Sequence, residues 1–444
     1  MRSATANLAS PVAAAWLRGG RWTPSWLASL LAAHELHVKA AARRRDDGRS
    51  HFMYVGERRP DLLADVHDCG TSRRVVTASD FFSAIEQPDA PSALYLAAPL
   101  VELPGLLQHA PGWETLPGST AATAAPPMAQ LWAASTGAVT QCHYDVADNT
   151  FVQLSGEKEF LLWPPEAHAA LHLFPDCHPR SRKAQLDLER PDRAAHPLSE
   201  ALPPPLRLVL SAGDVLRLPA FWMHHVTSLT PTVSLNVFAD YSGVRAAASD
   251  ALRLDVPLHA AWPDELKRRG LATLLPPLLA AARGGAPPAP FLRQMIASRF
   301  EPLAAALPAS PPSSEPSEPS SSLPPRRRLV PPPPSWADLE PALREAAADG
   351  IEALERLRCE ADVEAARGPS APASWAALRD HGADAPPGAP RDGCARHPQG
   401  VLELTAAHLT ELCALRLFGA ANVRDELERL AARCEAAEGG DSDG

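Results

Sequence analysis

Three residues of this chain have the types and the spacing of a metal centre. His143 and Asp145 lie two positions apart, and two adjacent histidines, His224 and His225, follow far downstream. Two imidazoles and one carboxylate form the facial triad that holds Fe(II) in non-haem oxygenases and leaves metal positions open. A His-x-Asp pair is common by chance, so the prediction depends on the elements around it.

The residues around this pair predict β-strands. Side chains alternate between the two faces of a strand, so His143 and Asp145 would point the same way and Tyr144 the other way. The following segment predicts a hairpin, with arms at 151–154 and 157–163 and a turn at Ser155-Gly156.

One lysine on the second arm of this hairpin is unusual. Lys158 is in phase with Phe160 and Leu162, which are core residue types. A buried ammonium needs an anionic partner, so the pattern favours a buried anion beside Lys158. The alternative is a lysine of an edge strand that reaches solvent.

The downstream histidines also follow strand patterns. Residues 206–210 and 215–218 read as two short strands joined by a turn. Residues 233–238 predict a further strand, in which Asn236 is in phase with Phe238. One isolated histidine is more often structural, but two in a row after a Gly-Asp turn, downstream of His-x-Asp, favour a metal ligand.

At this point the sequence resembles the small Jumonji-C hydroxylases of the cupin superfamily, from about residue 127 to residue 241. The resemblance selects His224 over His225 as the third ligand. It implies Fe(II), 2-oxoglutarate and O2 as cofactor and cosubstrates. It also implies that Lys158 pairs with the far carboxylate of 2-oxoglutarate and that three further residues line its pocket: Thr140, Asn149 and Asn236.

The sequence departs from that family pattern at two places. The segment after Asn236 lacks the usual two aromatic residues and reads Val237-Phe238-Ala239, and Cys142 replaces a smaller or aliphatic residue. The first departure predicts a different pocket wall.

The fold implied by the strand pattern and by the resemblance is mainly β. We expect a double-stranded β-helix (the cupin jelly roll) with flanking helices. Residues 1–245 would form the catalytic domain, 246–303 a helical extension and a candidate dimerisation element, 304–335 a Pro/Ser-rich linker without regular structure, and 336–444 an α-helical accessory segment with a frayed acidic tail. Deleting the chain after about Pro308 should then leave iron binding and cosubstrate turnover intact.

Helical periodicity supports this division. Residues 263–275 and 291–303 predict two apolar-faced helices, and Pro276-Pro277 should end or kink the first of them. Residues 336–366 and 402–437 have helical spacing too.

Composition excludes several classes of protein. The formal net charge is −10, which argues against a broadly basic nucleic-acid surface. Seven cysteines without a CxxC motif suit a reducing compartment. No apolar run is long enough to cross a membrane, so we expect no membrane contact and a cytoplasmic or nuclear location. The acid-free first 34 residues leave an organellar transit peptide as the alternative.

One local basic cluster admits two interpretations. Arg180, Arg182 and Lys183 lie in the insert between the two metal motifs. They form either a solvated loop or part of the substrate entrance.

The predicted function is a dioxygenase that hydroxylates a side chain of a protein or peptide. One alternative, from the resemblance, is a hydroxylase of the hypermodified wybutosine base of tRNA. Another is a non-catalytic cupin used as a binding module, which the intact set of His143, Asp145, His224 and Lys158 disfavours. Histone demethylation is disfavoured because no zinc-binding or reader module accompanies the barrel.

Overall fold

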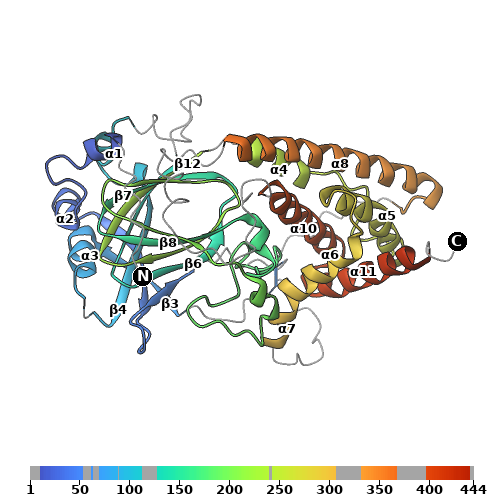
Figure 1. Cartoon of the computed structure of the whole chain (residues 1–444), viewed down its shortest axis with the longest axis horizontal. Coiled ribbons are helices and arrows are strands. Elements are labelled where there is room, and N and C mark those ends of the chain that lie inside the picture. The colour runs from blue at the N-terminus through green and yellow to red at the C-terminus, as the bar shows by residue number, and fades with distance from the viewer. Residues whose placement is uncertain are drawn as a thin grey trace, which may run out of the picture.

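The computed structural model of this protein describes residues 11–53, 62–63, 70–88, 90–112, 128–239, 243–306, 332–367 and 397–440. Within them, two β-sheets form a barrel and the C-terminal part is helical (Figure 1). Most of the expected Pro/Ser-rich linker, at 307–331, lies outside the described residues, so its lack of regular structure stays a prediction.

The two sheets face each other as a jelly roll, which confirms the predicted fold class. The larger sheet has the order β10-β7-β12-β5-β4-β1-β3 and the smaller β2-β6-β11-β8-β9. The bounds are β1 Glu35–Ala42, β2 Ser50–Phe52, β3 Thr71–Thr77, β4 Ser92–Pro99, β5 Met128–Ala134, β6 Ala138–Tyr144, β7 Asp148–Ser155, β8 Lys158–Trp163, β9 Leu206–Leu210, β10 Val215–Leu218, β11 Met223–Ser228 and β12 Thr232–Ala239.

Apolar side chains pack between the two sheets, and others pack on the outer face of the larger sheet. Phe151 and Leu216 of the larger sheet pack against Phe160 and Leu208 of the smaller one. Three N-terminal helices cover the outside of the larger sheet, at the left of Figure 1: α1 Pro11–Trp16, α2 Pro24–Leu31 and α3 Ala78–Ile85. Much of the barrel interior is therefore apolar, which makes the polar side chains inside it conspicuous.

The predicted hairpin over residues 151–163 is wrong. Its two arms are strands, but β7 pairs with β10 and β12, whereas β8 pairs with β9 and β11 in the other sheet. Gly156 makes the crossing at φ +71°, where a Cβ would lie 2.0 Å from the Pro231 carbonyl oxygen. The sequence pattern gave both strands, but partners are chosen by long-range packing.

The helical part also differs from its prediction. The helices are α4 Gly243–Leu252, α5 Asp264–Ala282, α6 Pro288–Met295, α7 Glu301–Ala306, α8 Trp336–Arg367, α10 His397–Phe418 and α11 Val423–Gly440. Of the two outcomes predicted for Pro276-Pro277, the helix end is wrong, because α5 continues past them with Leu274, Leu275, Leu278 and Leu279 all buried. Burial of four leucines, at about 1.5–3 kcal/mol each, offsets the cost of the two interior prolines, at about 3 kcal/mol each.

The helical segment is not separate from the barrel, contrary to our expectation. One continuous apolar core joins Tyr144 and Trp163 of the barrel to α5, α8, α10 and α11. Gly400 of α10 lies so close to the barrel that a Cβ there would meet the Glu166 backbone nitrogen at 2.5 Å. Figure 1 shows α10 between the barrel and the outer helices. Among the described residues, no helix is long and apolar enough to span a membrane.

Candidate active site

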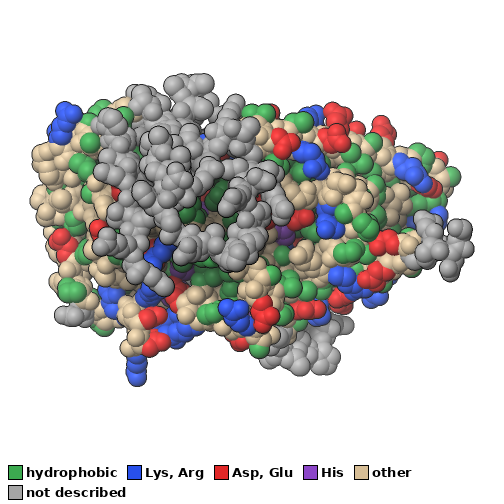
Figure 2. Space-filling model, in the orientation of Figure 1, with side chains coloured by type: hydrophobic (Ala, Val, Ile, Leu, Met, Phe, Trp, Pro, Cys, Tyr) green, Lys and Arg blue, Asp and Glu red, His purple; other side chains and the backbone are tan. Residues whose placement is uncertain are grey.

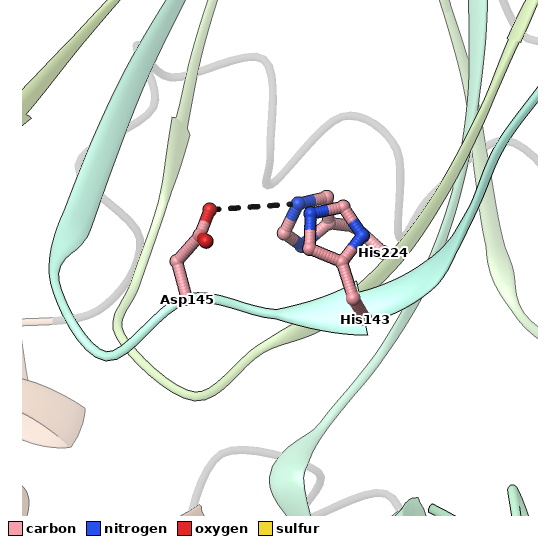
Figure 3. A group of neighbouring side chains, drawn as sticks. All are labelled: His143, Asp145 and His224. Carbon is pink, nitrogen blue, oxygen red and sulfur yellow. Dashed lines mark ion pairs between the residues drawn. The ribbon is translucent and has the colours of Figure 1, made fainter. Parts of the chain in front are cut away.

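The three predicted metal ligands meet at one end of the barrel (Figure 3). His143 on β6 pairs directly with His224 on β11, and Asp145 follows the end of β6. Their ligand atoms all lie within 4.8 Å of one another. His224 Nε2 is 3.7 Å from Asp145 Oδ2, and the imidazole centroids are 4.1 Å apart. Two nitrogens and one carboxylate thus surround a single point.

A bulge in β6 sets which residues face this point. On β11, His224 and Val226 lie two residues apart, whereas their partners on β6, His143 and Thr140, lie three apart. The extra residue restores the inward direction, so Thr140 and His143 line the same cavities. Strict alternation would have pointed Thr140 outward.

Backbone carbonyls orient both imidazoles. His143 Nδ1 donates to the Gln141 carbonyl at 2.8 Å, and His224 Nδ1 donates to the Trp222 carbonyl at 3.1 Å. The lone pair of each ring is then on Nε2, where a metal can bind it. Burial, with the neighbouring His224, holds the pKa of His143 well below its ordinary value, so that this ring is neutral.

His225 faces the other side of the sheet, as alternation requires. Its Nε2 lies 2.9 Å from Glu189 Oε1, on the outside of the barrel. The structure therefore brings His224, and not His225, to the triad.

Lys158 is buried inside the barrel, as its phase predicts. It is 4% exposed, donates to Ser234 Oγ at 2.7 Å and lies 5.1 Å from the centre of the Phe151 ring. Burial lowers its pKa from 10.5 to about 7. Among the described residues, no carboxylate lies within ion-pair distance of this amine, so an anionic ligand would complete its surroundings.

A series of hydrogen-bonded side chains leads from Trp132 to Asp145. Trp132 Nε1 donates to Asn236 Oδ1 at 2.6 Å, and Asn236 Nδ2 donates to Asn149 Oδ1 at 3.0 Å. Asn149 Nδ2 in turn lies 3.5 Å from Asp145 Oδ2. This distance is at the limit of a hydrogen bond, so the contact is a weak one that still restrains the position of the carboxylate.

Two cavities meet at the triad. The smaller one, of about 80 Å³, is lined by all seven predicted site residues. The larger one, of about 280 Å³, shares His143 and Asp145 with it and extends to Arg182 and Lys183. An inner chamber that ends at Lys158 and an outer chamber in front of the triad suit a cosubstrate and a substrate respectively.

Several residues of these chambers escaped the sequence analysis. The Tyr95 hydroxyl lies 3.0 Å from Thr140 Oγ1, and the Tyr95 ring packs on Trp132 and Phe52. Tyr95 and Trp132 belong to strands with ordinary apolar alternation, so no feature of the neighbouring sequence identified them as site residues. Lys183 lay in a cluster for which two interpretations stayed open.

A second histidine-carboxylate group lies outside the barrel. His51, Asp187 and Glu189 bring their ligand atoms within 4.8 Å of one another. Arg44 pairs with Asp187 at 2.7 Å and Arg49 with Glu189 at 3.1 Å. These arginines already neutralise the carboxylates, so we interpret the group as a set of ion pairs that hold the insert against the sheet.

Comparison with known proteins agrees with this geometry. The model of the cupin-like domain family matches residues 12–242, which include the whole barrel. A lysine-specific demethylase of Arabidopsis thaliana, JMJ31, is 34% identical over 107 residues, or 24% of this chain and 20% of that protein. The tRNA wybutosine-synthesizing protein 5 of Gallus gallus is 38% identical over 104 residues, or 23% of this chain and 31% of its own length.

A third relative is named for a different activity. The human bifunctional peptidase and (3S)-lysyl hydroxylase JMJD7 is 30% identical over 157 residues, or 31% of this chain and 48% of that protein. The matched regions thus span between a fifth and about half of these relatives. The chain is similar both to enzymes named for protein lysine and to one named for tRNA.

Proposed function

Because the chain belongs to the cupin-like domain family and carries the triad of the Jumonji-C oxygenases, we propose that it is an Fe(II)- and 2-oxoglutarate-dependent dioxygenase. The observation that carries the proposal is the joint position of His143, Asp145 and His224 beside a chamber that contains Lys158. A metal centre alone would not need a buried amine, and a buried amine alone would not need the triad.

The donor set fits Fe(II). His143 and His224 would supply their Nε2 atoms and Asp145 an oxygen, which leaves positions open on the metal. Bound iron with 2-oxoglutarate and O2 supplies the oxidising chemistry. The residues of this chain provide the geometry and keep both imidazoles in the ligating tautomer.

Lys158 and Thr140 would bind the cosubstrate. The amine of Lys158 would hold the far carboxylate through a charge-assisted hydrogen bond. Thr140 and the Tyr95 hydroxyl, 3.0 Å apart, can add hydroxyl donors in the same chamber. Asn149 and Asn236 line that chamber and keep Asp145 in place.

For the substrate we propose a protein or peptide side chain, with a tRNA base as the second candidate. The relatives named for lysine demethylation and lysyl hydroxylation support the first, and the wybutosine-synthesizing relatives support the second. The net charge of −10 argues against the long basic surface that a polyphosphate backbone needs, which favours the protein substrate.

The test is release of succinate from 2-oxoglutarate by the full-length chain with Fe(II) and O2. We expect slow turnover without substrate that is abolished in His224→Gln. The matched control is His225→Gln, which changes the adjacent imidazole on the opposite face. If both variants lose iron equally, or if the wild-type chain releases no succinate, the proposal fails.

Mass spectrometry of candidate proteins and of tRNA identifies the substrate class by which of them changes in mass, and the sign of the change identifies the reaction. A hydroxylated product is heavier by one oxygen, whereas a demethylated product is lighter by one methylene.

A cytoplasmic or nuclear location and a homodimer through the helices after the barrel are further proposals. Sedimentation of the purified chain tests the second of them.

A further inference from the structure

The outer chamber is strongly cationic for so acidic a protein. Among the described residues that line it, three are cations, Lys39, Arg182 and Lys183, and the one carboxylate is that of Asp145 in the triad. A metal bound there would add further positive charge. The chamber therefore presents its cations toward any substrate that approaches the reacting centre.

Lys183 enters this chamber through backbone pairing with a metal ligand. The insert forms an antiparallel bridge in which Lys183 opposes His143, and the bridge is fixed by the Ala184 amide donating to the Cys142 carbonyl at 2.8 Å. Opposed residues project to the same face, so the amine stands on the inward side beside His143. Lys183 is 8% exposed.

Arg182 reaches the same chamber because its backbone is left-handed. Consecutive residues of an extended segment point to opposite sides, yet Arg182 and Lys183 both line the cavity. The φ of Arg182 is +66°, a conformation that residues with a Cβ rarely adopt. Such backbone strain is concentrated at functional sites.

The cationic surface continues onto the rim. On the larger sheet, Lys39 of β1 lies directly opposite the exposed Arg73 of β3. The two side chains extend the positive charge of the chamber to its rim.

Several described arginines near this chamber are already paired. Arg44, Arg49 and Arg190 form ion pairs with carboxylates of the insert and of the β1–β2 loop. The helical half carries interspersed acidic and basic side chains (Figure 2). Four cations suit one or two carboxylates, whereas a nucleic-acid backbone needs a longer basic track.

We propose that the outer chamber binds an acidic peptide segment, in which one carboxylate contacts Arg182 and Lys183 beside the triad and a second contacts Lys39 and Arg73 at the rim. The inference rests on the proposed function and specifies its substrate class. The target side chain would then lie next to an acidic residue in its own sequence.

The experiment is fluorescence anisotropy of a labelled oligoglutamate peptide with the full-length chain at low ionic strength, beside oligolysine and oligouridylate of the same length. We expect binding of oligoglutamate that weakens with added salt and little binding of the other two. Preference for oligouridylate, or no binding of oligoglutamate, would overturn the inference. Succinate release without substrate tests the proposed function independently.

Arg182→Gly is the informative variant. Glycine accepts a positive φ, so the change should relieve strain and leave the melting temperature unchanged or higher, while oligoglutamate affinity falls by about tenfold or more. Arg73→Gln, on an exposed position, should weaken binding less, and Arg182→Lys should restore part of it. Arg356→Gln on α8, which is also exposed, is the matched control. Equal loss in Arg356→Gln, or unchanged affinity in Arg182→Gly, would refute the subsite.

Discussion

Arg299 and Glu411 form a buried ion pair that ties the C-terminal helices to the insert beside the active site. Arg299 Nη1 lies 2.8 Å from Glu411 Oε1 and 2.9 Å from Asp176 Oδ2. The three side chains are at most 4% exposed. Glu411 comes from α10 and Asp176 from the insert, so one arginine joins segments that are far apart in the chain.

Replacing Glu411 should therefore destabilise the whole protein. In Glu411→Ala, the buried guanidinium of Arg299 would lose one of its two carboxylate partners and keep only Asp176. Breaking a buried ion pair in this way costs about 3–5 kcal/mol. Urea unfolding measures this loss. The control is Glu352→Ala, which breaks an exposed pair on α8 with Arg356 and should cost about 0.3–0.5 kcal/mol. Equal midpoints for the two variants would contradict the structural role.

Truncation after Pro308 should now have the opposite effect to the one the sequence suggests. The deletion removes α8, α10 and α11, whose leucines share one core with the barrel. We expect the truncated chain to aggregate or to bind a hydrophobic dye, because it exposes a large apolar face. Intact iron binding by a soluble, monodisperse truncation product would show that the barrel folds alone.

Much of the site could be predicted from the sequence because its signals are local. Strand periodicity gave β9 and β10 with their exact bounds and placed Lys158 inside the barrel. The spacing of the histidines, read with the family resemblance, selected His224. These inferences need only a few neighbouring residues and the alternation of a strand.

The remainder depends on contacts between distant segments. Nothing near Glu411 marks it as the partner of Arg299, and an apolar helix pattern does not say which surface it covers. The bulge that turns Thr140 inward arises from pairing with β11. The left-handed backbone of Arg182, next to the bridge between Lys183 and His143, brings two adjacent cations into one chamber, and no local sequence signal marks it.

His172 should make stability depend on pH in the acid range. It is fully buried, donates from Nδ1 to the Ser298 carbonyl at 2.9 Å and packs edge-on against His196. Burial lowers its pKa from 6.5 to about 4. Between these values the unfolded chain binds more protons than the native one, so stability present above pH 6.5 is lost as the pH falls toward 4.

The matched variant for this effect is His172→Asn. Asparagine tolerates the φ of +49° at this position and can still donate to Ser298. We expect its free energy of unfolding to vary less with pH across that window, by up to about 1.4 kcal/mol per unit of pKa shift removed. An unchanged acid slope in the variant would assign the dependence to other groups.

Lys158→Ala should impair cosubstrate binding and leave the metal in place. Loss of a charged hydrogen bond at a buried site costs about 2–4 kcal/mol, or roughly 30- to several-hundred-fold in the KM for 2-oxoglutarate. Fe(II) affinity, measured separately by titration, should stay nearly constant. Lys158→Arg should not rescue fully, because a planar guanidinium needs a differently shaped pocket. Unchanged 2-oxoglutarate dependence in Lys158→Ala would leave a metal-binding cupin without this cosubstrate.

The affinity for 2-oxoglutarate should fall as pH rises above neutrality. The amine of Lys158 has its pKa lowered to about 7 by burial, so the free enzyme already holds the ammonium below that pH. Above pH 7 the amine must take up a proton when the dicarboxylate binds, because the charged form makes the stronger bond. The dissociation constant should then rise by up to about tenfold per pH unit. Calorimetry in buffers of different ionisation enthalpy would detect the proton uptake at pH 8. A dissociation constant that is flat from pH 6 to 9, with no proton uptake, would remove Lys158 from the cosubstrate site.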